Sequence, residues 1–427
     1  MPTPCQARVS LASELRTNPM KIELPRVPVR VPGFQFGSAA CGIKESGNQD
    51  VSIVFAERGA TAAAAFTTNR VCAAPVQIAR AHVQNGRIRA IVTNSGNANA
   101  FTGKTGLRDA RRMCEVAARE LGVPVRQVLP CSTGRIGVPL PMDRLEHGIR
   151  EACRTLSADR FYDALAGIMT TDAFPKFAVR TIELAGTPVT LAGMAKGAGM
   201  IAPRMRVLVP HATLLSFILT DAHLSPMALR RVLQRALPET FNAIVVDGDT
   251  STNDTVVLLA SGQAETAPIS ERSVPFSDFA RACTEIMGEL ARMVVRDGEG
   301  ATRVVTVHVR GARTKRDAET AADAVARSPL CKAAFHGGDP YMGRVVCALG
   351  YSGAEFDPDR LRIYLNDLLV VEKGTERVRE CESEASTIVS QPEFTLSIDL
   401  GAGAAQATRI CSDLTEDYVR FNSAYRT

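Results

Sequence analysis

The chain has 427 residues, of which 45% are hydrophobic and 22% are charged, with a formal net charge of +5. This length exceeds what one hydrophobic core usually organises, so we expect two domains or two closely packed layers. The 50 basic residues stand against 45 acidic ones along the chain, and aromatic residues make up only 5%. These numbers argue against a nucleic-acid-binding stripe or a base-stacking platform, and they are compatible with a basic patch for a small anionic substrate.

The cysteines and the apolar segments indicate the compartment. The eleven cysteines include no C-x-x-C pair, and the shortest separation runs from Cys331 to Cys347. Such a scattered, odd-numbered set predicts reduced, mostly buried thiols in a cytoplasmic protein, without a local zinc or redox motif. No apolar run reaches the ~18 residues of a membrane span. Arg8, Glu14 and Arg16 near the start argue against a secretion signal.

The first third of the chain predicts mainly strands. Residues 1–32 contain six prolines and predict a variable, poorly structured lead-in. Residues 33–79 predict short strands between turns, namely VSIVFAE, TAAAAFTTN and APVQIA. Residues 87–100 predict a strand that ends in the polar loop NSGNANA, which is either a plain turn or the rim of a site. Apolar residues at helical spacing then predict a helix over 107–121, with Gly122 as its C-cap.

The segment QVLPCSTGRIG, residues 127–137, predicts a strand that runs into a Ser-Thr-Gly turn. Backbone N–H groups and a hydroxyl at such a turn are the components of an oxyanion hole, although an ordinary turn has the same composition. Two helices are expected over 143–156 and 158–169, leading into TTDAFPK. The strands TIELAG and TPVTLAG then form an expected pair.

The stretch MAKGAGMIAPRMRVLVPHATLLSFILTDA, residues 194–222, is the one around which we expect the chain to be organised. Its Lys-Gly-Ala-Gly turn has glycines that accept unusual backbone conformations, and its Ala212-Thr213 precedes an apolar run. A Thr activated by its own free α-amine is a known type of nucleophile, and it requires cleavage just before the Thr. The alternative is a Thr that simply favours β-structure.

The second half predicts alternating helices and strands. We expect a helix over 225–238, a strand, polar loop and strand over 241–262, an amphipathic helix over 279–294, a strand over 303–309 and a helix over 317–327, followed by short strands and turns to the end. The polar loop contains Asp247, Asp249 and Asp254, but their spacing is not that of an EF-hand. We therefore expect a hydrogen-bonded loop that supports a site, and no metal.

Taken together, these motifs resemble one family, the ornithine acetyltransferases (glutamate N-acetyltransferases) of arginine biosynthesis. The motifs are FTTNRVCAAPV, NSGNANA, CSTGRIG, TTD at 170–172, MAKGAGMIAP, ATLLSFILTDA, VDGDTSTNDT, VRDGEGAT and DLTEDYVRFNSAYRT. They occur in the family's order and at near-family spacing from about Gly33 to Thr427.

The resemblance implies an α/β fold of the DmpA/ornithine-acetyltransferase type, with β-sheets sandwiched between helical layers. It also implies a precursor that cleaves itself between Ala212 and Thr213. The expected products are an α chain over 33–212, preceded by the lead-in, and a β chain over 213–427. Two copies of each chain are expected to form an α2β2 heterotetramer in the cytoplasm.

The implied reaction is acetyl transfer from N2-acetyl-L-ornithine to L-glutamate through an acetyl-Thr213 intermediate. By resemblance, Thr133 and Gly134 supply the oxyanion hole. The implied substrate-binding residues are Thr171, Lys196, Thr213, Glu299, Asn422 and Thr427. Lys196 can also hold down the pKa of the Thr213 amine, because two neighbouring cations repel each other. No bound cofactor or metal is implied, and use of acetyl-CoA as a second acetyl donor stays open.

Two other functions remain as alternatives. An amidohydrolase of N-acyl amino acids would use the same acyl-Thr chemistry with water as the acceptor. An unprocessed, non-catalytic binding paralogue would have lost cleavage. Taken singly, Lys196, Glu299, Asn422 and Thr427 are also ordinary positions for surface residues.

The chain departs from the family pattern at four places. Eight residues, Arg204 to His211, stand between MIAP and ATLL where the family normally has two. The insertion lengthens the loop at the scissile peptide, so the resemblance supports self-cleavage less strongly than it supports Thr213 as the nucleophile. Ala173, Met342 and Cys72 replace the more usual Thr, Trp and Lys. These differences leave room for an altered preference for the acyl donor or acceptor.

Overall fold

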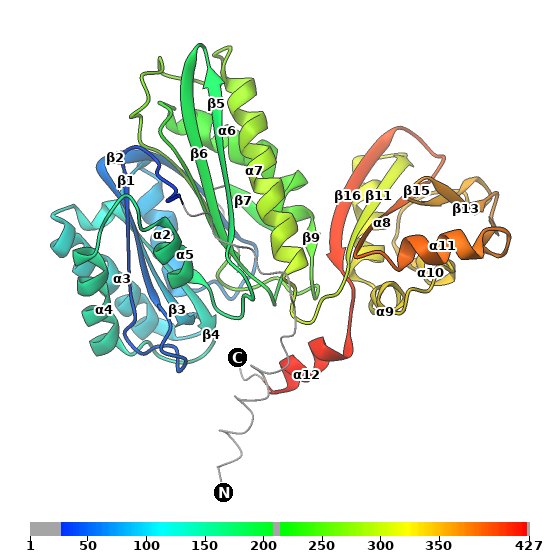
Figure 1. Ribbon diagram of the computed structural model, residues 1–427, viewed down its shortest axis with the longest axis horizontal. Coiled ribbons are helices and arrows are strands. Elements are labelled where there is room, and N and C mark those ends of the chain that lie inside the picture. The colour runs from blue at the N-terminus through cyan, green and yellow to red at the C-terminus, as the bar shows by residue number, and fades with distance from the viewer. Residues whose placement is uncertain (1–26, 208–213, 425–427) are drawn as a thin grey trace, which may run out of the picture. The chain divides into compact units, whose positions relative to one another are not determined.

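The structure is a computed structural model that describes residues 27–207 and 214–424. These residues form two compact units (Figure 1). The large unit contains the described residues up to Asn242 together with Thr250–Val294. The small unit contains Ala243–Asp249 and the described residues from Val295 onward. The expected division into an α and a β chain at residue 213 is a prediction about the covalent chain, and it does not coincide with these units.

The large unit is built on a nine-stranded sheet with the order β4-β3-β2-β10-β8-β6-β5, in which β1 and β7 also pair with β2. Its strands are β1 (Phe34–Ala39), β2 (Val51–Thr67), β3 (Arg87–Asn97), β4 (Val128–Arg135), β5 (Lys176–Leu184), β6 (Thr187–Lys196), β7 (Met205–Val207), β8 (Leu215–Thr220) and β10 (Thr255–Ala260). Its helices are α2 (Ala74–Val83), α3 (Gly103–Leu121), α4 (Met142–Arg154), α5 (Phe161–Ile168), α6 (Pro226–Ala236) and α7 (Phe276–Arg296), whose last two residues belong to the small unit.

The small unit has a seven-stranded sheet with the order β14-β13-β12-β15-β11-β16-β9. Its strands are β9 (Ile244–Val245), β11 (Val304–Ala312), β12 (Arg362–Leu365), β13 (Leu368–Glu372), β14 (Thr375–Glu376), β15 (Glu393–Asp399) and β16 (Ala405–Ser412). Its helices are α8 (Lys315–Arg327), α9 (Pro329–Gly337), α10 (Gly343–Tyr351), α11 (Glu382–Val389) and α12 (Glu416–Ala424). The two units together also contain short 3-10 turns, namely η1 (Val125–Gln127), η2 (Leu237–Glu239), η3 (Phe241–Ala243), η4 (Pro358–Arg360) and η5 (Val378–Glu380).

Helices cover both faces of the large sheet. Alternate residues of a strand point to opposite faces, and on β2 the side chain of Ile53 joins a core with α3 and α4, whereas Val54 joins a core with α5. In the small unit, α8 to α11 pack on the buried face of the sheet, where Val307 of β11 and Leu396 of β15 lie. The expected α/β class, with sheets and helical layers, is confirmed.

Two of the expected strands near the N-terminus are wrong in detail. VSIVFAE and TAAAAFTTN were expected as separate strands, but they form the single strand β2 of 17 residues. Its register against β3 shifts between Phe55 and Ala60, around Gly59 at φ +84°. A bulge of this kind absorbs the polar ERG segment without ending the strand.

The segment APVQIA is a helix and not a strand. It begins α2, with a proline in the first turn, where the missing N–H is not needed for a helical hydrogen bond. The ending expected for the helix over 107–121 is confirmed, because Gly122 caps α3 with φ +63°. The C-terminal third, expected as strands and turns, also contains α9 to α12. These helices have only 8 or 9 residues each, too few for a clear helical period in the sequence.

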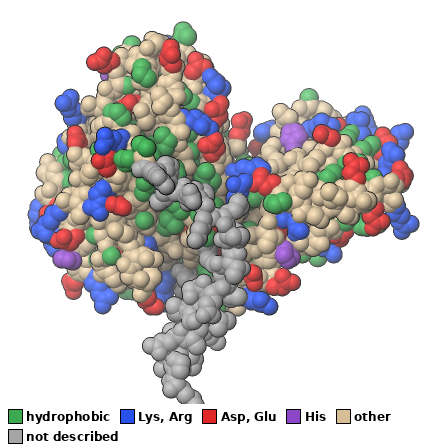
Figure 2. Space-filling view, viewed as in Figure 1, with side chains coloured by type: hydrophobic (Ala, Val, Ile, Leu, Met, Phe, Trp, Pro, Cys, Tyr) green, Lys and Arg blue, Asp and Glu red, His purple; other side chains and the backbone are tan. Residues whose placement is uncertain are grey.

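The ten described cysteines are all free thiols, as expected. Five of them are buried, four are half-buried and Cys347 is exposed, so burial is less general than the sequence indicated. On the face that Figure 2 shows, basic and acidic side chains are interspersed and form no long basic stripe. No helix in the described ranges is long and apolar enough to cross a membrane.

Candidate active site

The expected oxyanion-hole residues lie at the end of β4 in the large unit. β4 runs parallel to β3, and Gly134 is paired with Gly96. Gly134 has φ +130°, and a Cβ built on it would lie 2.3 Å from the carbonyl carbon of Gly96. Only glycine fits this position, because the two strands approach each other too closely for a side chain. The neighbouring Thr133 is 2% exposed.

Lys196, at the end of β6, brings the expected site residues of this unit together. Its Nζ donates a hydrogen bond to Thr133 Oγ1 at 3.1 Å and another to Thr170 Oγ1 at 2.7 Å. The side chain is buried, with Lys196 only 5% exposed. A buried ammonium at the end of a strand is a type of group that can stabilise developing negative charge.

Asp172 is the residue that holds this cluster in place. Its carboxylate accepts hydrogen bonds from the backbone N–H of Gly197 at 2.7 Å and of Thr170 at 2.8 Å. It also accepts a hydrogen bond from Lys176 Nζ at 2.6 Å, and both side chains are completely buried. Burial opposes ionisation of this carboxyl, yet the charges of Lys176 and Lys196 and these hydrogen bonds hold its pKa well below the usual range.

Sequence reasoning named Thr171 for substrate binding, but it did not assign roles to Thr170, Asp172 or Lys176. The structure places Thr171 in a half-buried position and joins Thr170 to Lys196. The available signal was the TTD motif itself, since two of its three residues contact the cluster. The pairing of Asp172 with Lys176 was not visible, because nothing in the spacing shows that both side chains turn inward.

A buried network of polar side chains connects β4 to the neighbouring segments. Ser132 Oγ donates to Asn94 Oδ1 at 2.6 Å, and Asn94 Nδ2 donates to the Asn97 carbonyl at 2.8 Å. Asn253 Nδ2 donates to the carbonyls of Ala98 at 2.6 Å and Ser132 at 2.8 Å. Residues 94–97 of NSGNANA, expected as a loop, form the end of β3, and this segment and the polar loop before β10 are thus tied to β4. Their role in the structure is that of a support, as expected for the loop around Asn253.

The expected residues Glu299 and Asn422 come together in the small unit. Asn422 Nδ2, on α12, donates to Glu299 Oε2 at 3.0 Å, and Glu299 is 7% exposed. Gly300 has φ +72°, and a Cβ there would lie 2.5 Å from the backbone nitrogen of Tyr418. Thr415 Oγ1 donates to the Gly300 carbonyl at 2.8 Å. The glycine therefore allows α12 to pack closely on the loop that carries Glu299.

The surroundings of Glu299 are acidic. Burial raises the pKa of Tyr418, and the neighbouring carboxylates of Asp247, Asp249 and Glu299 raise it further. Negative charges of this kind favour a cationic ligand group such as an ammonium, and the buried Lys332 next to Asp247 balances part of this negative potential. This potential belongs to the small unit, whereas Lys196 and Asp172 belong to the large one.

The expected nucleophile Thr213, its neighbour Ala212 and the expected substrate residue Thr427 lie outside the described residues. The chain is anchored on both sides of the predicted cleavage position. On one side β7 pairs with β2, and Met205 exchanges two hydrogen bonds with the side chain of Asn242, at 2.7 and 2.8 Å. On the other side the Leu214 carbonyl accepts a hydrogen bond from the backbone of Thr255. Part of the insertion thus forms a strand, which the sequence had not predicted.

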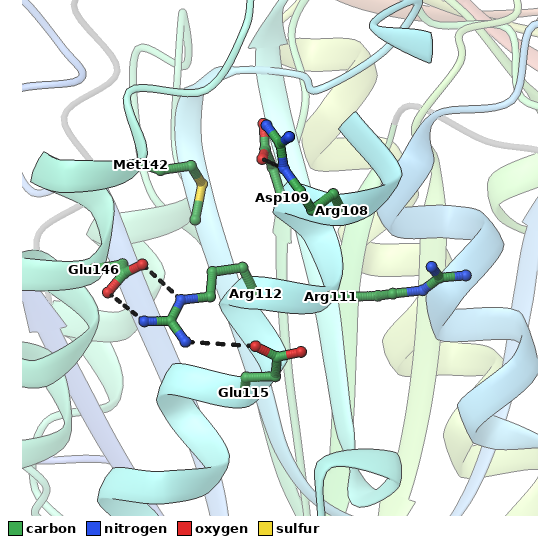
Figure 3. A pocket seen from close by; sticks show the side chains of 7 residues that line it. All are labelled: Arg108, Asp109, Arg111, Arg112, Glu115, Met142 and Glu146. Atoms are coloured by element: carbon green, nitrogen blue, oxygen red, sulfur yellow. Dashed lines mark hydrogen bonds and ion pairs between the residues drawn. The ribbon is translucent and has the colours of Figure 1, made fainter. Parts of the chain in front are cut away.

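A pocket of about 370 Å³ lies elsewhere in the large unit, between α3 and α4 (Figure 3). It is lined by Arg108, Asp109, Arg111, Arg112, Glu115, Met142 and Glu146. Figure 3 shows Arg112 pointing between two carboxylates, with bonds of 2.7 and 3.0 Å to Glu146 and of 3.5 Å to Glu115. Its positive charge is therefore matched within the pocket, and the contact ties α3 to α4. In the described part of the chain, no group of His, Cys, Asp and Glu side chains is arranged to hold a metal.

Comparison with known proteins gives the family. The model of the ArgJ family matches residues 35–427. The arginine biosynthesis bifunctional protein ArgJ of Geobacter sulfurreducens is 44% identical over 399 residues, which cover 93% of this chain and 100% of the relative. The protein of the same name from Symbiobacterium thermophilum is 46% identical and covers 92% of this chain and 97% of the relative.

Two solved structures are also similar. The bifunctional protein ArgJ of Bacillus halodurans is 36% identical, with a TM-score of 0.47, over 49% of this chain and 98% of that one. The ornithine acetyltransferase of Mycobacterium tuberculosis, solved in complex with ornithine, is 36% identical, with a TM-score of 0.38, over 43% of this chain and 98% of that one. On the family match and the identity to full-length relatives, this chain belongs to the ArgJ family, and the expected class of enzyme, an N-acetyltransferase of arginine biosynthesis, is confirmed.

Proposed function

We propose that this protein transfers an acetyl group from N2-acetyl-L-ornithine to L-glutamate through an acetyl-Thr213 intermediate, after cleaving itself between Ala212 and Thr213. The observation that carries the proposal is the bond from Lys196 to Thr133, next to Gly134. This arrangement gathers a cation, a hydroxyl and a strand end with glycine geometry where an acyl-transfer reaction needs to stabilise an oxyanion. The relatives' name, a bifunctional protein of arginine biosynthesis, supports the same pathway.

In the proposed first half-reaction, Thr213 Oγ attacks the acetyl carbonyl carbon of the donor, and the α-amine of Thr213 takes up the hydroxyl proton. The carbonyl oxygen becomes an oxyanion, which Thr133 and the backbone of Gly134 stabilise. When the C–N bond breaks, the proton passes to the departing nitrogen and ornithine leaves. In the second half-reaction the amine of glutamate attacks the ester, and Thr213 regains its proton.

The substrate-binding groups are proposed from their surroundings in the structure and from the family resemblance. Glu299, in acidic surroundings and hydrogen-bonded to Asn422, is suited to pair with an ammonium of the donor. Thr171 and Thr427 are proposed as further hydrogen-bonding residues, from the resemblance alone. We also propose assembly of the two cleaved chains as an α2β2 heterotetramer in the cytoplasm. Acetyl-CoA is proposed as an additional acetyl donor, and the word bifunctional in the relatives' name supports this proposal.

Two measurements on the purified protein test the proposal. The intact mass under denaturing conditions should show two chains, the second beginning at Thr213, and not the single chain of 45.8 kDa. Thr213→Ala should stay uncleaved and inactive, whereas Thr213→Ser, which keeps a hydroxyl, should be cleaved and retain activity. Product analysis should give acetylglutamate that depends on added glutamate. Acetate in its place would support the amidohydrolase, and turnover by Thr213→Ala would refute the mechanism.

A further inference from the structure

Lys44 lies on the loop between β1 and β2, among a group of buried and half-buried charges. The loop folds around Asp50, whose carboxylate accepts hydrogen bonds from the backbone N–H groups of Cys41, Ile43 and Lys44, at 2.8, 2.7 and 3.2 Å. At its other end, the Lys44 ammonium donates to the Gln49 carbonyl at 2.5 Å. The side chain is half-buried and held at both ends, so little conformational entropy remains to be lost when a ligand binds.

The side chain of Lys44 packs against the end of β3, the strand that pairs with β4. A Cβ built on Gly96 would lie 3.3 Å from Lys44 Cγ. Gly96 is in turn paired with Gly134, and a Cβ on Gly134 would lie 2.3 Å from the Gly96 carbonyl carbon. Lys44 therefore packs on Gly96, which in turn packs on Gly134. These contacts place Lys44 beside the candidate active site of the large unit.

Charged groups from three elements act on the Lys44 ammonium. Burial lowers the pKa of Lys44 to about 8; Asp50 and Asp172 favour the charged form, and Lys196 opposes it. Together with the buried Lys176, the described cluster contains three lysines and two aspartates. With Lys44 protonated it has an excess of positive charge, which favours an anionic ligand group such as a carboxylate.

We propose that Lys44 is a specificity-determining residue whose ammonium receives the side-chain carboxylate of the acceptor amino acid. This inference rests on the proposed function. Glutamate brings two carboxylates, whereas acetylornithine brings one carboxylate and an ammonium, which a second lysine repels. Lys44 thus favours the acceptor over the donor, and over released ornithine, when the acetyl group leaves the enzyme.

Steady-state kinetics of the processed enzyme separate the two half-reactions. In a ping-pong cycle, kcat/KM for the donor reports acylation only, and kcat/KM for the acceptor reports deacylation only. Lys44→Gln should lower kcat/KM for glutamate about tenfold, as expected for one lost charge-assisted contact, and should change kcat/KM for acetylornithine by less than about twofold. Lys44→Arg should keep most of the glutamate activity. Lys104→Gln, an exposed lysine on α3, serves as the matched control and should change neither value.

The preference for glutamate over glutamine gives a second measurement, because both acceptors share the α-amine and differ in the side-chain charge. In the wild type this ratio should fall as the pH rises through about 8, where Lys44 loses its proton. The ratio should be flat in Lys44→Arg, which stays charged, and low throughout in Lys44→Gln.

Equal losses of both kcat/KM values, or no loss in Lys44→Gln, would overturn the role of Lys44 and leave the proposed function standing. A wild-type enzyme that forms no acetylglutamate at all would refute the proposed function and this inference with it. The two failures are distinguished by the wild-type product alone.

Discussion

Lys196 Nζ lies 3.1 Å from Thr133 Oγ1, a contact between two residues 63 positions apart in the chain. Thr133 lies near the end of β4 and Lys196 at the end of β6, and β3, β2, β10 and β8 lie between these two strands in the sheet. The contact is made by the side chains of the two strand residues, and it is buried. Lys196 also donates to Thr170, so the same buried lysine links the end of β4 to the TTD motif.

Gly134→Ala should destabilise the protein far more than Gly137→Ala. A methyl group at Gly134 would lie 2.3 Å from the Gly96 backbone, whereas nothing lies within 4 Å of a methyl group at Gly137. Both residues have positive φ, so each variant also carries backbone strain of about 1 kcal/mol or more. The clash should add about 2 kcal/mol or more to the loss in Gly134→Ala. Urea unfolding of the two variants measures the difference, and equal midpoints would contradict the close packing.

Asp172→Asn should destabilise the large unit by about 3–5 kcal/mol, because it leaves the buried Lys176 ammonium without the charge of this carboxylate. The double variant Asp172→Asn, Lys176→Met removes both charges and should recover much of this loss. Unfolding free energies of the three proteins form a test in which the double variant is the control. If the double variant is as unstable as the single one, the ion pair is not the cause.

Stability should also depend on pH through Asp172. Its pKa is lowered in the folded protein, so the folded state binds this proton less readily than the unfolded state. The stabilisation is therefore complete above the ordinary aspartate pKa, about 4, and is lost as the pH falls toward the lower folded value. Unfolding curves between neutral pH and pH 3 should show this loss in the wild type. A smaller slope in the double variant, which lacks the pair, is the expected signature.

Glu299→Gln should weaken use of acetylornithine more than Asn422→Ala. The first change removes the charge proposed to pair with the donor ammonium, and about a hundredfold loss in kcat/KM is expected. The second removes the hydrogen bond from Asn422 to Glu299, for which about fivefold is expected. Ser423→Ala, on the same helix, removes only a bond to the Arg420 carbonyl and should be neutral. Similar effects of all three changes would indicate damage to α12 and not loss of a binding group.

Arg112→Gln should cost about 1 kcal/mol of stability, because Arg112 forms a two-pronged contact with Glu146 that joins α4 to α3. Arg111 lies on the same helix and lines the same pocket, but its side chain is exposed, so Arg111→Gln should change stability by less. The difference should shrink in high salt, which screens partly exposed pairs. Thermal unfolding of both variants at two salt concentrations checks this expectation.

The family, the α/β class and the helices α3 to α8 could be predicted from the sequence alone. Motifs such as CSTGRIG and MAKGAGMIAP indicated the ends of two strands, and the structure places both there. Positions at which one residue type strongly favours one local structure were predicted correctly, such as Gly122 at the end of α3. Local rules failed where the signal was short or interrupted, as in APVQIA, in the bulged β2 and in the small helices α9 to α12.

Which polar residues face one another became known only from the folded chain. The sequence contained Lys44, Asp172 and Lys176 but gave no reason to separate them from ordinary surface charges. Their partners come from other strands and loops, and strand pairing across the large sheet determines which of them meet. Burial then makes each charge depend on a neighbour, because an unpaired charge in the interior is too costly to keep. The chemistry of the motifs was therefore readable in the sequence, whereas the charges that support it depend on tertiary contacts between distant segments.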